Sequence, residues 1–188
     1  MSEAAAADLV HGHNDLVFNF GIEGYQPQWL HGRDAITTAH GRRLAALAGH
    51  TLRHVWLVWD LDADEWFADC PVLLDFGADQ VEVNHQKFDD LSITWNSADP
   101  TRPVRWPTSD DFQLAWRAEP LPQLAPLPGQ RLSHAELLEW AGDDMANGSI
   151  ALSFALSTAQ LIIYNALDEN GLTVDPPEPC WRRQPLTR

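Results

Sequence analysis

Two loops rich in acids and amides contain the side chains best suited to general acid–base chemistry. The first loop, NHQKFDD, contains the polar residues Asn84, His85, Asp89 and Asp90. The second, NALDEN, offers Asn165, Asp168, Glu169 and Asn170 at the corresponding places. A histidine beside two carboxylates can supply a general base with an orienting acid, so His85, Asp89 and Asp90 are catalytic candidates. Because Asp and Asn also bond their own backbone in turns, recurrence in two loops favours turn chemistry.

A run of alternating acids resembles the start of a calcium-binding loop. It consists of Asp60, Asp62 and Asp64, followed by Glu65. The sixth loop position needs a glycine and is Glu65 here, and the twelfth needs a bidentate glutamate and is Pro71. The run therefore predicts a solvated acidic turn between two strands.

Nine tryptophans are many for a chain of 188 residues. Most are expected in the core, and any that stay exposed beside acids would form anchors for a protein partner. Trp66 is the best single candidate, because it follows the acidic run directly. The predicted partner-binding residues are Asp60, Asp62, Asp64, Glu65 and Trp66.

The string HGHND places His11 and His13 near the N-terminus. It resembles the metal-binding start of the membrane dipeptidase and wider amidohydrolase families, in which H-x-H or H-x-D at a strand end binds zinc. The resemblance implies a zinc hydrolase with His11 and His13 as ligands. Those enzymes need a (β/α)₈ barrel of about 250 residues, and this chain has 188. We therefore expect no metal or other cofactor, with these histidines in an exposed loop.

Familiar catalytic signatures are missing from the sequence. It contains no G-x-S-x-G elbow, P-loop, G-x-G-x-x-G, H-E-x-x-H or C-x-x-C motif. Cys70 and Cys180, the only cysteines, are too few for a disulfide framework or a thiolate zinc site. These absences favour a binding protein over an enzyme.

Two segments share the pattern L-A-x-L-x-G-x-x-L. Leu44 to Leu52 reads LAALAGHTL and Leu124 to Leu132 reads LAPLPGQRL, an offset of 124 − 44 = 80. Similar alternating runs, which predict half-buried strands, follow each copy in the same order. These runs are VLLDF, QVEV and LSITW in the first copy, and IALSF, QLII and LTV in the second. We interpret the chain as two diverged copies packed about a pseudo-twofold axis.

The remaining elements differ between the copies. HVWLVWD predicts a strand in the first. In the second, Ser133 and Glu136 form a capping box that predicts a short helix continuing through Ala141 and ending near Gly148. Residues 36–47 fit a helix taken alone, but Pro126 and Pro128 in the counterpart argue against it. The connection is expected to contain a short strand, FQLAW.

The predicted fold is α+β, mainly antiparallel β with few short helices, in one domain of 188 residues. Its parts are repeat units 44–96 and 124–175, each from a unit of about 80 residues, a connection 97–123 and an extended tail 176–188. The chain has no apolar run of about 20 residues and no secretory leader. We therefore expect no membrane contact and a cytoplasmic location.

The net charge of −15 argues against nucleic acid as a partner. It fits solubility, or a field that steers a basic protein to the surface. In size, acidity and lack of catalytic motifs the chain resembles the immunity proteins with which bacteria neutralise a toxin. We predict an acidic module that binds such a basic partner. The alternatives are a small enzyme or ligand-binding domain with a cleft between the copies, and a structural subunit that forms a homodimer.

Overall fold

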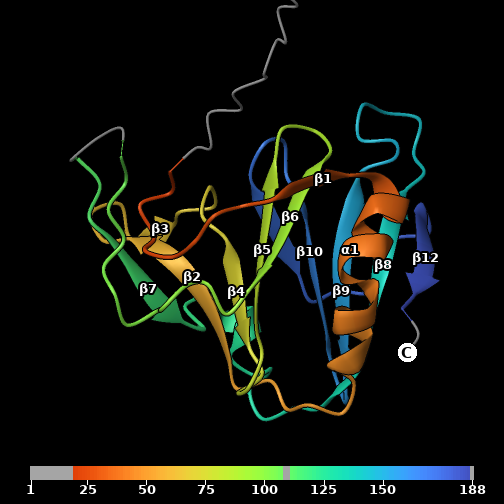
Figure 1. Cartoon of the computed structure of the whole chain (residues 1–188), viewed down its shortest axis with the longest axis horizontal. Coiled ribbons are helices and arrows are strands. Elements are labelled where there is room, and N and C mark those ends of the chain that lie inside the picture. The colour runs from red at the N-terminus through yellow and green to blue at the C-terminus, as the bar shows by residue number, and fades with distance from the viewer. Residues whose placement is uncertain (1–18, 108–110, 187–188) are drawn as a thin grey trace, which may run out of the picture.

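The computed structural model describes residues 19–107 and 111–186. In these ranges the chain forms two antiparallel β-sheets and one α-helix (Figure 1). The predicted mainly antiparallel α+β class is therefore confirmed. None of the described helices has the length and apolar character needed to cross a membrane.

The first sheet has seven strands in the order β1-β6-β5-β4-β2-β3, and β7 pairs with β2. A meander of four antiparallel strands, β2, β4, β5 and β6, forms its centre. The strands are β1 (Trp29–His31), β2 (His54–Asp60), β3 (Glu65–Trp66), β4 (Val72–Asp75), β5 (Gln80–Gln86), β6 (Asp90–Trp95) and β7 (Leu114–Ala118).

The second sheet has five strands in the order β11-β10-β9-β8-β12. Its strands β8, β9, β10 and β11 again form an antiparallel meander. The strands are β8 (Leu132–Trp140), β9 (Ile150–Leu156), β10 (Gln160–Asn165), β11 (Asn170–Thr173) and β12 (Trp181–Pro185).

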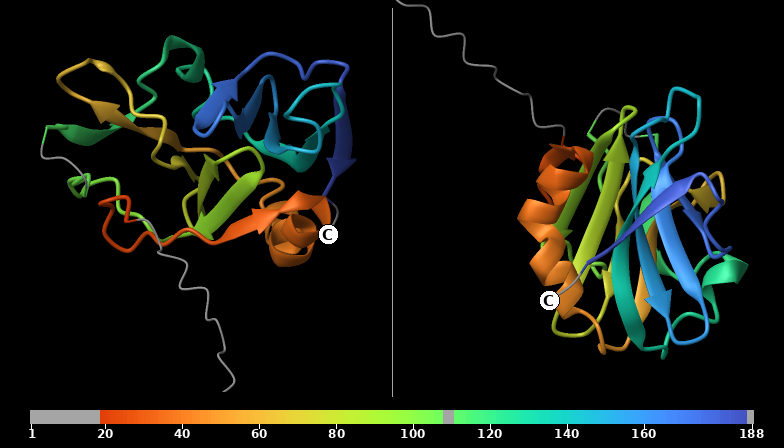
Figure 2. Two further views of the ribbon diagram at one scale, coloured as in Figure 1. Left: turned by 90° about the horizontal axis from the view of Figure 1, so that it is seen from above. Right: turned by 90° about the vertical axis from the view of Figure 1, so that its right-hand side faces the viewer.

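The main core lies between the two sheets. Period-2 alternation directs Val83 of β5 and Phe154 of β9 into it. The helix α1 (Gly32–Ala46) lies across the opening between the β1 edge of the first sheet and the β8–β12 side of the second (Figure 2). Its residues Ile36 and Leu44 are fully buried in the same core, so α1 closes that side of the molecule.

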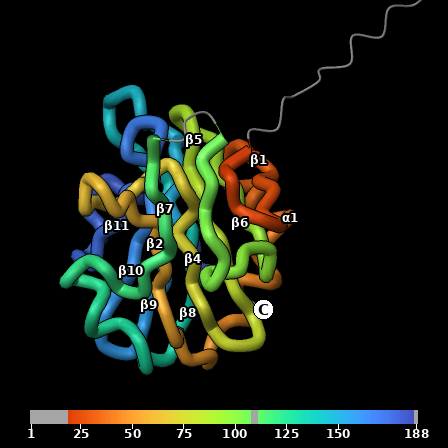
Figure 3. Tube along the Cα trace, turned by 90° about the vertical axis from the view of Figure 1, so that its left-hand side faces the viewer, coloured from red at the N-terminus to blue at the C-terminus, as the bar shows by residue number. Residues whose placement is uncertain are grey.

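A second apolar cluster covers the outer face of the first sheet. Phe20 and Tyr25, from the segment before β1, pack there with Leu73 of β4 and Val104 of the connection. Figure 3 views this side, with the N-terminal segment in red beside β6 and the green segment before β7 crossing in front of the sheet. The first sheet is therefore covered on both faces.

Two helix predictions are wrong in opposite directions. Residues 36–47, for which a helix was disfavoured, lie almost entirely in α1. Pro126 and Pro128 act only in their own segment, which forms turns directly after the short 3₁₀ helix η1 (Pro122–Leu124). Residues 133–141, predicted as a helix, belong mainly to strand β8. Pairing with β9 on one side and β12 on the other satisfies the β8 backbone, and it outweighs the local capping signal.

The two leucine–glycine segments pair with each other. Gly49 donates its backbone N–H to Leu132 at 2.7 Å, and Gly129 donates to Leu52 at 2.8 Å. A second reciprocal pair joins Leu52 to Gln130 at 2.9 Å and Leu132 to His50 at 2.8 Å. These contacts connect the two sheets at the end of the molecule where both segments turn.

The tail is more ordered than predicted. Within 176–186, residues Trp181–Pro185 form β12, the edge strand beside β8. Arg183 of β12 donates two hydrogen bonds, at 3.1 and 2.7 Å, to the buried carboxylate of Glu136. Because β11 and β12 are opposite edges of the sheet, the seven residues between them, 174–180, must span it. This connection forms one wall of a recess on the outer face of the second sheet.

Candidate functional site

A recess of about 550 Å³ lies on the outer face of the second sheet. Its floor is Ile162 of β10, and its walls come from β8, the loop 141–149 and the connection 174–180. Four strand spacings of about 4.8 Å separate β11 from β12, or roughly 19 Å. Seven residues reach roughly 23 Å when extended. The connection bends at Asp175 and turns before Trp181, which donates its backbone N–H to Glu178 at 3.1 Å, and Pro176 and Pro177 fit the extended part between these two points.

Three aromatic rings line the recess. Trp140 and Trp181 are directly opposite each other in the β8–β12 register, and their ring centroids lie 5.0 Å apart at 68°, edge to face. Tyr164 of β10 completes the set. All three side chains are partly exposed. Alternation along β8 and β10 places them on the same side of the sheet as the buried Leu138 and Ile162.

Three carboxylates surround these rings. Asp144, Asp175 and Glu178 line the recess and are exposed. The indole N–H of Trp140 donates to both oxygens of Asp144, at 2.9 and 3.0 Å, which fixes ring and loop together. In the described chain no lysine or arginine lines the recess. An aromatic surface with uncompensated negative charge favours a cationic ligand, and the volume lies within the usual range of binding pockets.

The partner-binding residues predicted from sequence lie elsewhere, at the turn between β2 and β3. Asp60 is buried and accepts hydrogen bonds from Asp62 N at 2.9 Å and Ala63 N at 3.3 Å, which is turn chemistry. Asp62 and Glu65 are exposed. Neither of them lines the recess or the described hollows of about 580, 360 and 90 Å³.

The remaining two side chains of that turn contact the fold itself. Asp64 accepts hydrogen bonds from the Trp59 indole at 2.9 Å and from Arg117 at 3.1 Å, and these bonds lower the pKa of its carboxyl. Trp66 is half-buried and packs against the main core. The turn thus offers less accessible aromatic surface than the recess does.

The two acidic loops meet at one end of the molecule. Asn170 is the central residue: its Oδ1 accepts the backbone N–H of His85 at 2.9 Å, and its Nδ2 donates to Asn84 at 2.6 Å. Asn165 donates to the backbone carbonyl of Lys87 at 2.6 Å, and Lys87 N donates to Asp168. These polar side chains therefore join the two sheets.

His85 is enclosed at this junction. Its ring nitrogens lie 3.1 Å from Asn170 Oδ1 and 3.1 Å from the Ile150 carbonyl oxygen, and the residue is 3% exposed. Burial lowers the pKa of His85 to about 4. The adjoining cavity, shared with Asp69 and Asp168, holds about 90 Å³, well below the roughly 300 Å³ of the smallest ligand pockets.

Asp89 and Asp90 do not join His85. Asp90 pairs with Gln86 across the β5–β6 hairpin, whereas His85 pairs with Leu91, so Asp90 and His85 point to opposite faces. Asp90 and Asp89 instead lie beside His31 of β1. The three catalytic candidates are thus divided between two places. His11 and His13, the weak metal candidates, lie outside the described residues.

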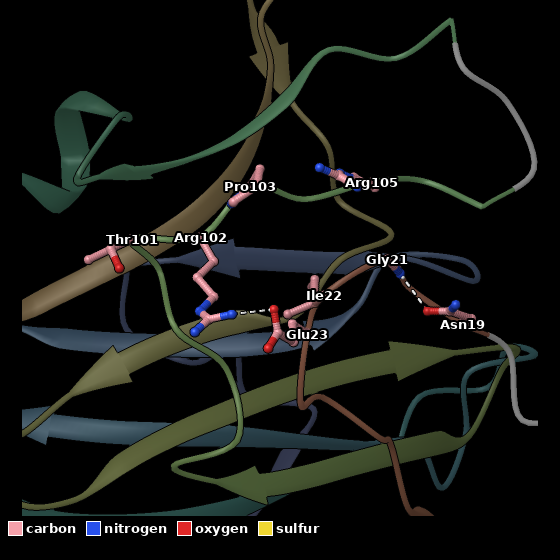
Figure 4. Close-up of a pocket in the computed structure, with 8 residues that line it drawn as sticks. All are labelled: Asn19, Gly21, Ile22, Glu23, Thr101, Arg102, Pro103 and Arg105. Atoms are coloured by element: carbon pink, nitrogen blue, oxygen red, sulfur yellow. Dashed lines mark hydrogen bonds and ion pairs between the residues drawn. The ribbon is translucent and has the colours of Figure 1, made fainter.

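Another hollow, about 580 Å³, lies between the N-terminal segment and the connection before β7 (Figure 4). Arg102 and Glu23 point toward each other there and form an ion pair. Gly21 accepts a backbone hydrogen bond from Arg105 at 2.9 Å, and a Cβ on Gly21 would overlap the Arg105 carbonyl. Arg102 and Glu23 already pair with each other, and no aromatic ring of the described residues lines this hollow, so the recess on the second sheet is the better candidate.

The recess residues were missed in the sequence because they come from four separate stretches. The signals present were two tryptophans, each close to acids, and the proline-rich stretch DPPEP before Trp181. Their assembly depends on β12 pairing with β8, which no local pattern indicates.

Comparisons with known proteins place the chain in no group: no protein-family model, no curated protein and no solved structure matches it.

Proposed function

We propose that the protein is a binding module that captures a basic protein partner by taking a cationic side chain into the recess. The observation that carries this proposal is the combination of Trp140, Trp181 and Tyr164 with three carboxylates around one hollow. A guanidinium or ammonium group stacks favourably on indole faces, and the attraction increases where water is excluded. The carboxylates Asp144, Asp175 and Glu178 supply complementary charge.

The charge of the whole chain supports the same partner class. A net charge of −15 attracts a basic protein over several ångströms before contact and repels acidic ones. Buried aromatic contacts then slow dissociation. An immunity or inhibitor protein that neutralises a basic toxin in the cytoplasm combines these properties in a chain of this size, and it is the specific form of the proposal.

The test is a titration of tryptophan fluorescence with an arginine-rich peptide. Trp181→Ala, and separately the pair Asp175→Asn with Glu178→Gln, should weaken binding by about tenfold or more. The pair Asp62→Asn with Glu65→Gln removes the same charge from the β2–β3 turn and should change affinity little. Equal losses for the two charge pairs would contradict a defined site, and absence of binding by the unmodified protein would contradict the proposal.

A small enzyme with a cleft between the two halves is the second candidate. The convergence of the two acidic loops on Asn170 favours it. His85 is nevertheless almost fully buried, and Asp90 faces away from it. This candidate therefore ranks below the binding module.

We further propose that the two halves are diverged copies of one ancestral unit. Each contains a four-strand meander in the same order. The hydrogen bond from Gly49 to Leu132 has its counterpart in the bond from Gly129 to Leu52: the two donors are offset by 129 − 49 = 80 residues, and the two acceptors by 132 − 52 = 80. This arrangement supports a pseudo-twofold axis passing between the two segments.

A further inference from the structure

Three potential metal ligands converge where β1 meets β6. His31 is directly opposite Asp90 in the β1–β6 register, and Asp89 precedes Asp90 in the hairpin turn. His31 Nδ1 lies 2.8 Å from Asp90 Oδ1 and 3.7 Å from Asp89 Oδ2. All three donor atoms lie within 4.8 Å of one another.

The carboxylate of Asp90 gives an independent reason to expect a cation. Its side chain is 2% exposed, and its Oδ1 is buried; it lies 2.8 Å from His31 Nδ1 but accepts no hydrogen bond from that nitrogen or from any other described group. A buried carboxylate oxygen normally has a donor or a cation as partner. In contrast, buried Glu82 receives hydrogen bonds at both oxygens, among them Thr94 at 2.7 Å and Ser97 N at 2.9 Å.

The spacing of the donors fits a small dication. Ligand atoms about 2 Å from a tetrahedral ion are separated from one another by roughly 3.3 Å. The distances from His31 Nδ1 to Asp90 Oδ1 and to Asp89 Oδ2, 2.8 and 3.7 Å, bracket that value. One imidazole nitrogen with two carboxylate oxygens suits zinc and its neighbours, whereas magnesium and calcium prefer oxygen ligands throughout.

We propose that His31, Asp89 and Asp90 bind one zinc-class dication, a site distinct from the aromatic recess. The ion would join the edge strand β1, which leads directly into α1, to β6, its neighbour in the first sheet. Three protein ligands leave a further coordination position open. The side chains of His31 and Asp89 are 62% and 63% exposed, so solvent can reach that position.

Lys87 competes with the ion for Asp90. Its Nζ lies 3.2 Å from Asp90 Oδ2, while its side chain is 70% exposed. The lysine can therefore move into solvent when a cation binds, but its charge weakens binding. Lys87→Ala should therefore strengthen binding of the cation.

The test is a zinc titration of the full chain against a competing chromogenic chelator. We expect one zinc ion per chain, weakened by roughly tenfold or more in His31→Ala and in Asp89→Asn. Asp89 is exposed, so its variant keeps the fold, and circular dichroism checks both. His134→Ala is the control and should bind like the unmodified protein, and Lys87→Ala should bind more tightly.

Three outcomes would overturn the site. The first is that the unmodified chain binds no zinc. The second is that His31→Ala binds zinc as tightly as the unmodified chain. The third is that zinc binding is lost in a double variant, His11→Ala with His13→Ala. Cobalt provides a second readout, because a tetrahedral site with nitrogen and oxygen ligands gives visible absorption that His31→Ala should abolish.

Discussion

The side chains buried between and beneath the sheets show how single residues determine this structure. Glu136 is neutralised by Arg183, whereas Glu82 has hydrogen bonds from uncharged donors. His85 has acceptors at both ring nitrogens, although a neutral imidazole can donate to one of them only. Protonation would satisfy both acceptors, but burial opposes the charge and lowers the pKa of His85 to about 4.

This conflict predicts a loss of stability in acid. The unfolded chain takes up a proton on His85 near its ordinary pKa of 6.5, whereas the folded chain does so near pH 4. The unfolded state therefore binds more protons between those values, and stability falls as the pH decreases through them. From pH 7 to pH 5 the free energy of unfolding should fall by about 2 kcal/mol through this residue.

Urea unfolding of the unmodified protein and of His85→Gln at both pH values measures this contribution. Carboxylates titrate in both proteins, so the difference between their pH dependences isolates His85. His134→Gln should behave like the unmodified protein. An equal decrease in all three would show that His85 is not the responsible group.

Elements differed in how well the sequence predicted them. Strands such as β4 and β9 were predicted because their apolar residues alternate beside short turns. β8 was not, since Ser133 and Glu136 carry a helix-start pattern while the strand depends on partners about 20 and 45 residues further along the chain. The α1 prediction failed for a different reason: an inference was transferred between segments that share leucines but not prolines.

The paired segments at the turn give a prediction at the scale of elements. Gly49 and Gly129 have φ angles of 91° and 86°, which side chains rarely adopt, and each donates one of the reciprocal hydrogen bonds. Gly49→Ala and Gly129→Ala should therefore each lower the free energy of unfolding by about 1–2 kcal/mol. Neither added methyl group meets a backbone atom within 4 Å, so strain in the backbone is the cause.

Denaturant unfolding of both variants provides the measurement. Gly148→Ala is a useful comparison, because Gly148 has a φ of 91° in an exposed loop outside this pairing. Because Gly49 and Gly129 occupy equivalent positions, the two substitutions should lower the free energy of unfolding by similar amounts. A large cost at one and none at the other would contradict that equivalence.

At the scale of the whole molecule, composition led us to expect a basic partner, but it did not indicate where aromatic and acidic side chains would gather around a recess. The acidity and the many tryptophans predicted a surface that binds a basic partner. The turn at Asp62 to Trp66 was chosen because there acids and a tryptophan are adjacent in the sequence. The recess instead combines Trp140 with Trp181 and the connection between opposite sheet edges. Such a site exists only after the second sheet has formed, so its residues share no spacing in the sequence.

The net charge of the chain and the contacts in the recess should affect different steps of binding, and this difference can be tested. Asp175→Lys with Glu178→Lys, and Asp62→Lys with Glu65→Lys, each change the net charge from −15 to −15 + 4 = −11. If the field of the whole chain steers a basic partner, both pairs should slow association with an arginine-rich peptide to a similar extent. Only the recess pair should also speed dissociation, because it alone alters contacts made in the complex.

Stopped-flow fluorescence at low and high salt distinguishes these effects. Association by the unmodified protein should slow by about tenfold as salt screens the field, and the two variant pairs should converge with it at high salt. Dissociation from the recess pair should stay faster at every salt concentration, since those contacts lie within the screening distance. If the peptide dissociates faster from the Asp62→Lys, Glu65→Lys variant instead, the binding site is at the β2–β3 turn and not in the recess.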